Sequence, residues 1–325
     1  MKRAQVPIGF FAGVGGSLLG LLLVHFGLVY AQLGVPTHSS AWAFEINQKK
    51  FQRAMSIKGP KLLIAGGSGA LFGIRAEQIE AQLNYPAVNL STHAALGTAY
   101  VLELARRAAQ PGDTVLFVPE YYCLGGMRRD NLFIDYILAR DPDYFRAMNI
   151  GERFDAAMSV SFHRLRRGIA NRFRPELERP RQELYDSKNL SPHGDQLGAE
   201  AANRPANPKT LYVPDPALEN GFVDFPIGFA PVEAFCKRAR TNGVQLLATY
   251  PNILDHPAYE TAKAREALRQ IKEGYERLGI PVVGELKESM FPASAFYDTR
   301  YHMTLEGSRL RTEQLIPHLA PYLKK

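Results

Sequence analysis

The stretch that most constrains the fold is residues 61–73, Lys-Leu-Leu-Ile-Ala-Gly-Gly-Ser-Gly-Ala-Leu-Phe-Gly. Residues 62–65 predict a buried β-strand, the glycines predict a tight turn, and a helix is expected from there to about Leu83. Ser68 would then lie at the carboxyl edge of a sheet, beside a helix N-terminus that favours negative charge. Ser68 is therefore a candidate nucleophile, and its own N–H and that of Gly69 are candidate oxyanion donors.

Strands and helices alternate over much of the remaining chain. Strands are predicted at 86–90, 114–119, 244–249 and 281–283, and helices at 94–109, 232–241, 259–278 and 305–323. Each predicted strand is almost entirely apolar, which is typical of a parallel sheet covered by helices on both faces. The expected fold class is therefore α/β, with a parallel sheet flanked by helices.

This alternation is interrupted between residues 121 and 225. Residues 130–175 have a helical pattern, whereas residues 180–225 are rich in Pro, Asn, Gly and Asp. We expect an insertion over the carboxyl edge of the sheet, where substrate-shaping elements usually lie. Seven arginines occur between Arg164 and Arg181. A solvated helix face most often accounts for such a run, and contact with an anionic glycan or lipid headgroup is the alternative.

The N-terminus carries a long apolar run. No Asp, Glu, Lys or Arg occurs from Pro7 to Tyr30, which is long enough to cross a bilayer. Lys2 and Arg3 are expected to stay in the cytoplasm, so the rest of the chain would lie on the periplasmic or extracytoplasmic side of a bacterial inner membrane. An uncleaved anchor is favoured over a signal peptide, whose apolar region is usually about 7–15 residues. Small residues at 12, 16 and 20 share one face, which suggests docking on another membrane helix.

The expected domain organisation follows from these patterns. Residues 1–35 would hold the cytoplasmic start and the anchor, and residues 36–60 a helix that lies at the membrane interface or packs on the domain. Residues 61–325 would form one domain with the insertion 121–225. The net charge of +7 over 325 residues does not indicate nucleic acid. Cys123 and Cys236 lack metal-site spacing and are expected to be buried free thiols rather than a disulfide. No metal or cofactor is expected.

A second chemical motif precedes the last predicted helix. Asp298 and His302 stand four residues apart there. A carboxylate can hold the Nδ1–H of an imidazole and leave Nε2 facing a serine hydroxyl. Taken alone, a histidine such as His302 is more often a capping or core residue. With Ser68 at the same sheet edge, the catalytic interpretation is favoured.

Three well-known glycine-rich motifs match the turn at residues 66–69 only in part. A dinucleotide fingerprint would need an acidic residue after the next strand, which ends at Asn89-Leu90, and a Walker A loop would need a lysine. Gly66-x-Ser68-x-Ala70 nearly matches the nucleophile elbow of α/β-hydrolases. In those enzymes, however, the serine follows several strands and the acid lies far from the histidine.

A serine after a glycine on the first strand, with a close Asp/His pair before the last helix, resembles the SGNH hydrolase superfamily. Gly66-Gly67-Ser68 stands where that family has Gly-Asp-Ser, and Asp298 and His302 stand for its Asp-x-x-His pair, with one residue more between them. Residues 88–97 resemble the second family block, so Ser91 or Thr92 would supply an oxyanion donor. Glu120 and Tyr121 occupy the place of the third-block Asn, and together with His93 they are candidate substrate-side residues.

The resemblance implies a flavodoxin-like three-layer sandwich. A membrane anchor before such a domain resembles the extracytoplasmic partners of membrane-bound O-acyltransferases in alginate and cellulose acetylation and in lipoteichoic acid D-alanylation. It implies an O-acyltransferase that carries an acyl group on Ser68, with a multi-span acyltransferase as partner and a polysaccharide or teichoic-type polymer as acceptor. The alternatives are an esterase that deacetylates a glycan and a non-catalytic subunit of a polysaccharide assembly machine.

Overall fold

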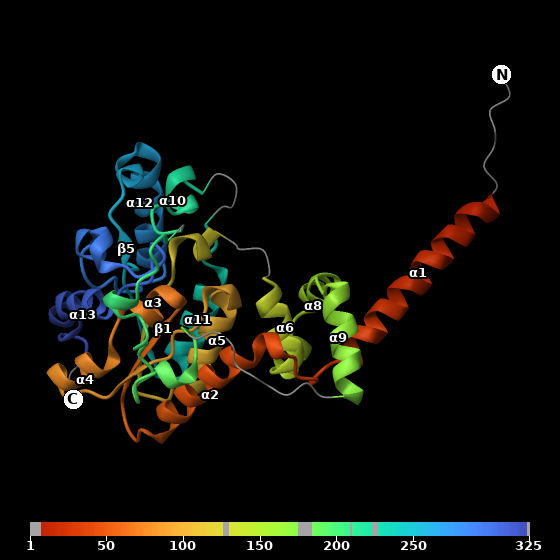
Figure 1. The fold of residues 1–325 in the computed structure, drawn as a ribbon, viewed down its shortest axis with the longest axis horizontal. Helices are drawn as coiled ribbons and strands as arrows, with labels where there is room; N and C mark the ends of the chain where they lie inside the picture. The colour runs from red at the N-terminus through yellow and green to blue at the C-terminus, as the bar shows by residue number, and fades with distance from the viewer. Residues whose placement is uncertain (1–7, 126–129, 175–183, 209, 223–226, 324–325) are drawn as a thin grey trace. The chain divides into compact units, whose positions relative to one another are not determined.

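The structure is a computed structural model that describes residues 8–125, 130–174, 184–208, 210–222 and 227–323, and of residues 8–10 and 12 it describes the backbone only. The chain forms two compact units (Figure 1). Unit 1 comprises residues 1–41 and 131–179, and unit 2 comprises residues 42–130 and 180–325. The predicted cytoplasmic pair, Lys2 and Arg3, lies outside the described residues.

Unit 2 is built on a parallel sheet. The strands are β1 (Leu62–Gly66), β2 (Ala87–Asn89), β3 (Thr114–Val118) and β4 (Gln245–Ala248), in the order β2-β1-β3-β4. All three pairings are parallel. The predicted strand 281–283 contributes one parallel bridge, Val282 to Ala248, at the β4 edge. Strands β5 (Ile253–Leu254) and β6 (Met290–Phe291) form a separate parallel pair. The prediction of an α/β fold with a parallel sheet is confirmed.

Helices cover both faces of this sheet because successive strand residues point to opposite sides. Leu63 and Ala65 of β1 belong to the larger apolar cluster, which includes residues of α5 and α11. Leu62 and Ile64 belong to the cluster formed with α4 and α13. Figure 1 shows these helix pairs on either side of β1. The helices of unit 2 are α2 (Ala41–Ser56), which begins one residue before the unit, α3 (Ser68–Gly73), α4 (Ala76–Leu83), α5 (Thr98–Ala108), α10 (Pro216–Asn220), α11 (Ala230–Thr241), α12 (Ala262–Arg277) and α13 (Leu305–Leu319).

The single helix predicted from Ser68 to Leu83 is divided into α3 and α4. Two polar side chains from distant segments supply the caps at this break. Asn89 Nδ2 donates to the carbonyls of Ala70 and Ile74, at 3.2 and 2.8 Å. The Asp195 carboxylate accepts the N–H groups of Ala76 and Glu77, at 2.7 and 3.0 Å. Because neither partner is local in sequence, periodicity alone did not indicate the break.

Helix α2 packs on unit 2. Trp42, Ile46, Lys50 and Ala54 recur every four residues and are all buried. Ala54 belongs to the same apolar cluster as β1 and β3. The structure therefore favours the expectation that this helix packs on the domain over the interfacial alternative.

Unit 1 contains the apolar N-terminal helix. Its helices are α1 (Ile8–Tyr30), α6 (Asn131–Ala139), α7 (Pro142–Ala147), α8 (Ile150–Met158) and α9 (Phe162–Phe173). Within α1, the 18 residues Gly13–Tyr30 have a mean hydropathy of 1.7 and are 6% buried. Of the helices in the described residues, α1 alone is long and apolar enough to cross a membrane, a property that anchors and signal sequences share.

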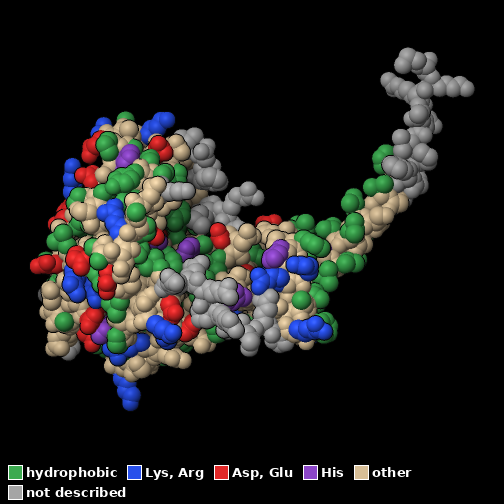
Figure 2. Space-filling view, viewed as in Figure 1, with side chains coloured by type: hydrophobic (Ala, Val, Ile, Leu, Met, Phe, Trp, Pro, Cys, Tyr) green, Lys and Arg blue, Asp and Glu red, His purple; other side chains and the backbone are tan. Residues whose placement is uncertain are grey.

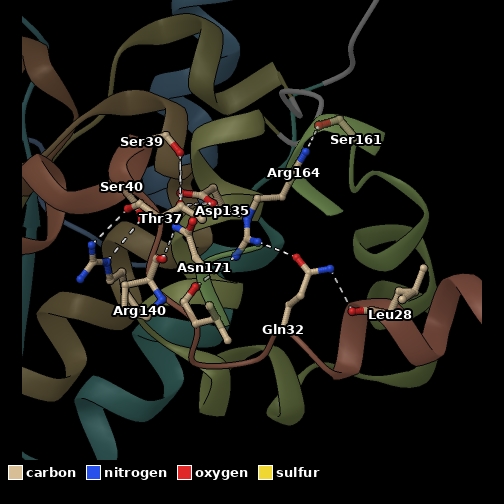
Figure 3. Close-up of polar contacts among 12 residues, drawn as sticks. Leu28, Gln32, Thr37, Ser39, Ser40, Asp135, Arg140, Ser161, Arg164 and Asn171 are labelled. Atoms are coloured by element: carbon tan, nitrogen blue, oxygen red, sulfur yellow. Dashed lines mark hydrogen bonds and ion pairs between the residues drawn. The ribbon is translucent and has the colours of Figure 1, made fainter. Parts of the chain in front are cut away.

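A buried polar cluster ties the end of α1 to α6 and α9 (Figure 3). The Asp135 carboxylate accepts hydrogen bonds from Thr37 at 2.6 Å and from Ser39 at 2.9 Å, and it forms an ion pair with Arg164. Arg164 also donates to Gln32 Oε1 at 2.7 Å. These charges are shielded from water but paired, so removing one partner would leave the other buried and unpaired, at a large cost in stability.

Candidate active site

Ser68 is the first residue of α3 and directly follows the turn after β1. Its side chain is largely buried. A Cβ added at Gly66 would lie 2.3 Å from the Val118 carbonyl oxygen, so only glycine allows β1 and β3 to approach this closely here. The predicted strand–turn–helix is thus present, and it places the Ser68 hydroxyl at the carboxyl end of β1.

Glu120 lies against this turn. It follows β3, and its carboxylate fills the space that side chains at positions 67 and 69 would need. A Cβ at Gly67 would lie 2.2 Å from Glu120 Oε2. Oε1 accepts the Gly69 N–H at 2.7 Å and lies 3.5 Å from Ser68 Oγ. Glu120 therefore accepts the Gly69 N–H that was predicted as an oxyanion donor, and its carboxyl group lies beside the Ser68 hydroxyl.

The environment of Glu120 favours its neutral form. Burial raises the pKa of the carboxyl group, and the hydrogen bond from Gly69 N–H acts in the opposite direction. A neutral Glu120 can donate its O–H to an oxyanion, whereas an ionised Glu120 would repel one. A side-chain amide at this position would donate a hydrogen bond at every pH.

His302 and Asp298 lie together in the loop before α13. The two atoms His302 Nδ1 and Asp298 Oδ1 are 2.8 Å apart. The His302 ring stacks on Phe72, one turn after Ser68 in α3, with centroids 4.3 Å apart and an interplanar angle of 13°. The carboxylate holds the proton on Nδ1 and Phe72 fixes the ring plane, so Nε2 is left as an acceptor.

Tyr185 connects Ser68 with His302. Its hydroxyl oxygen lies 3.4 Å from His302 Nε2. The same hydroxyl is hydrogen-bonded to Ser68, which opposes the rise in the Tyr185 pKa that burial causes. The ring packs against Phe72 and Trp42, with centroids 5.6 and 4.9 Å away. Ser68 and His302, from opposite ends of the chain, therefore meet at one tyrosine hydroxyl. Tyr185 lies in the stretch 180–225 that is rich in Pro, Asn, Gly and Asp, and no motif indicated it.

His93 borders this cluster from the other side of Tyr185. The two rings lie 5.5 Å apart, and His93 also contacts Trp42. Burial and the proximity of His302 lower the pKa of His93 to about 4, so the ring is neutral at physiological pH. Its Nδ1 accepts the Ala95 N–H at 3.1 Å, which leaves Nε2 as a donor near the tyrosine.

The predicted oxyanion donors of the second block are already used within the chain. Ser91 N–H donates to Asn89 Oδ1 at 3.0 Å, and Thr92 N–H donates to the Gly66 carbonyl at 3.1 Å. The Thr92 hydroxyl is buried and has no hydrogen-bond partner in the part of the chain that the structure describes. Of the predicted backbone donors, Gly69 N–H faces Glu120, and Ser68 N–H opens the helix.

Tyr121 belongs to the core. It is buried in the larger apolar cluster, and its N–H donates to the Tyr301 hydroxyl at 3.2 Å. Tyr301 in turn donates to Asp215 at 2.7 Å. The predicted substrate-side residues are thus separated: His93 and Glu120 adjoin the Ser68 cluster, whereas Tyr121 supports the segment behind it.

Among the described residues, no group of three or more His, Cys, Asp or Glu side chains is placed to hold a metal ion. Cys123 and Cys236 are both free thiols. Comparison of the chain with protein-family models finds no match, and no curated protein matches it. The contacts among Ser68, Tyr185, His302, Asp298 and Glu120 are therefore the features of the chain that bear on its function.

Proposed function

We propose that this chain is a membrane-anchored serine acyltransferase of the SGNH type that works with a membrane-bound O-acyltransferase and acylates a cell-envelope or exopolysaccharide. The observation that carries the proposal is the continuous series of contacts from Ser68 through Tyr185 and His302 to Asp298. A serine, a general base and an orienting carboxylate are the parts that acyl transfer requires. The apolar helix α1 supports anchoring in a bacterial inner membrane, with unit 2 on the periplasmic side.

In the proposed reaction, Ser68 Oγ attacks the carbonyl carbon of the acyl donor. The Ser68 proton passes to Tyr185 Oη as the Tyr185 proton passes to His302 Nε2. Asp298 stabilises the imidazolium that forms. The bond between the carbonyl carbon and the donor's leaving oxygen then breaks, and that oxygen receives the proton from His302.

The acyl group then rests on Ser68 as an ester. An acceptor hydroxyl attacks it after losing its proton to His302, and the proton returns to Ser68 Oγ as the ester bond breaks. The neutral acid of Glu120, whose Oε1 accepts the Gly69 N–H, donates its O–H to the negative oxygen in both steps. Water in place of a sugar hydroxyl would give the esterase alternative with the same residues.

The test uses the full chain purified in detergent. We expect release of product from an aryl acetate and an acetylated Ser68 peptide after rapid acid quenching. Ser68→Ala should abolish both, whereas Ser56→Ala, an exposed serine on α2, should change neither. Equal activity of the wild-type chain and Ser68→Ala would refute the enzymatic proposal and favour a non-catalytic subunit.

A second measurement separates transfer from hydrolysis. With an oligosaccharide acceptor present, transfer predicts acylated sugar at the expense of free acetate. If the acceptor leaves the acetate yield unchanged and no acylated sugar forms, the esterase alternative holds. Co-purification of the full chain with a multi-span acyltransferase would test the proposed partner.

A further inference from the structure

Unit 1 contains an apolar groove between α1 and the end of α8 and α9. The groove has a volume of about 630 Å³, and its lining includes Leu18, Leu21 and Leu28 of α1 and Phe162, Arg166 and Ile169 of α9. Unit 1 also exposes large apolar side chains on α8 and α9. Ile150 is 84% exposed, Phe162 81% and Phe173 78%. Water is a poor environment for this much apolar surface, so the surface indicates a partner.

The position of the groove along α1 indicates that the groove lies at the depth of the bilayer. Its α1 residues fall within the apolar segment Gly13–Tyr30. At about 1.5 Å per residue, residues 18–28 extend over about 15 Å, or half of a bilayer core of about 30 Å. If α1 spans the membrane, α9 lies beside its C-terminal half, within one leaflet. The exposed apolar side chains of α8 and α9 then face lipid rather than water.

Contacts within unit 1 fix the positions of the helices that line the groove. The His25 ring is hydrogen-bonded to the Ala157 carbonyl at 2.9 Å, and Phe26 packs on Phe154 with centroids 5.4 Å apart. Just after the C-terminal end of α1, the buried cluster of Figure 3 joins Arg164 of α9 to Gln32. Helix α8 is thus attached to α1 and helix α9 to the segment that follows α1, so the groove is preformed.

Charge determines which molecule fits this groove. Arg166 lines it, Arg172 of α9 and Arg174 just after α9 are exposed, and α9 carries no acidic residue. Arg172 Nη1 donates to the Ala31 carbonyl at 2.6 Å, so this cation lies where α1 ends. Figure 2 shows basic and apolar side chains adjoining over this part of unit 1. Exposed aromatic and basic side chains on one helix are typical of binding to anionic lipids at a membrane surface.

A transmembrane helix of a partner protein fits the groove less well. Close helix packing in lipid favours small residues, whereas the groove is lined by leucines, an aromatic ring and an arginine. The small residues Gly16 and Gly20 have nothing within 4 Å of the Cβ position. At about 100° per residue, they lie about 120–160° around α1 from the centre of the groove. A partner helix could therefore dock on the opposite face without displacing the occupant of the groove.

We propose that the groove between α1 and α9 binds one anionic phospholipid, with an acyl chain against Leu21 and Ile169 and the phosphate at Arg166. The inference rests on the proposed membrane anchor and is independent of the chemistry at Ser68. It assigns unit 1 a task of its own, which is to fix the depth and orientation of the chain at the membrane surface.

The experiment is native mass spectrometry of the full chain in detergent, titrated with phosphatidylglycerol or phosphatidylcholine. We expect one phosphatidylglycerol to be retained preferentially. Arg166→Gln should weaken its binding about fivefold, as expected for one basic side chain near an anionic surface. The matched control is Arg238→Gln, on α11 of unit 2, which should leave binding unchanged. Ile169→Trp should fill the groove and weaken both lipids.

Several outcomes would overturn the proposal. These are equal binding of the two lipids, retention unaffected by Arg166→Gln and Ile169→Trp, or a second protein chain in place of lipid. Thermal unfolding of each variant checks that the fold is retained. Alkaline carbonate washing of membranes tests the anchor separately. Release of the chain would refute the anchor itself, whereas a chain that stays in the membrane and retains no lipid would refute the groove proposal alone.

Discussion

Replacing Glu120 by Gln or Leu tests the proposed oxyanion site most directly. Glu120 Oε1 accepts the Gly69 N–H at 2.7 Å, and the carboxylate occupies the space that side chains at positions 67 and 69 would take. A glutamine has the same shape and donates hydrogen bonds at every pH. A leucine fills a similar volume and donates none.

The expected changes in kcat follow from the loss of one hydrogen-bond donor to the oxyanion. Loss of a single oxyanion donor lowers kcat by about 10²–10³, or about 3–4 kcal/mol of transition-state stabilisation. We therefore expect Glu120→Leu to lose about 10²–10³ in kcat and Glu120→Gln to stay within about tenfold of the wild type. Because burial raises the pKa of Glu120, the wild-type donor is present at low pH and is lost as the pH rises through that pKa. Glu120→Gln should keep its activity at higher pH.

Stability gives a second, independent measurement. A group whose pKa is raised by folding contributes stability that is complete below its unfolded pKa, about 4.3, and is lost as the pH rises through the folded pKa. Each unit of difference corresponds to about 1.4 kcal/mol. In urea unfolding experiments, Glu120→Gln should remove this decline in the free energy of unfolding with rising pH. The control is Glu219→Gln, at an exposed position on α10, which should leave the decline unchanged.

The assay is aryl acetate hydrolysis by the full chain from acidic to alkaline pH. Activity of Glu120→Leu equal to or above the wild type would refute the proposed role, because Glu120 would then only obstruct the oxyanion position. A Glu120→Gln variant whose activity declines with rising pH as the wild type does would also contradict it.

The remaining predictions concern other parts of unit 2. Asp298→Asn should lower kcat about 10⁴-fold with a smaller change in KM, because the imidazole loses the carboxylate 2.8 Å from its Nδ1. Steady-state kinetics will test this. Burial lowers the pKa of Lys50 to about 7, so its contribution to stability is lost as the pH falls from about 10 to 7. Urea unfolding of Lys50→Met should lack this slope of about 1.4 kcal/mol per pH unit. Gly73→Ala should destabilise the fold by about 1–3 kcal/mol, since its Cβ would lie 1.8 Å from Asn252 Oδ1. The control is Gly15→Ala, because Gly15 has open space at its Cβ position. Equal losses in the free energy of unfolding for the two variants, measured in urea, would contradict this prediction.

The sequence predicted the residues of the candidate site only where a local pattern marked them. Ser68 follows an apolar strand and a glycine pair, and Asp298 and His302 stand four residues apart. The donors expected at Ser91 and Thr92 were inferred from the family resemblance, and their N–H groups donate to Asn89 and Gly66 instead. Whether an N–H is available depends on the acceptor nearest to it in space, which a local pattern does not specify.

The sequence by itself determined the parallel α/β sheet and the long apolar helix, because both depend on residue type and spacing within a short segment. Only the tertiary structure decided that Tyr185 would contact both Ser68 and His302, and that Glu120 would fill the space beside two glycines. These contacts join segments more than 50 residues apart. They arise because strands and helices pack side by side whatever their order in the chain, so their chemistry depends on distances that no single segment contains.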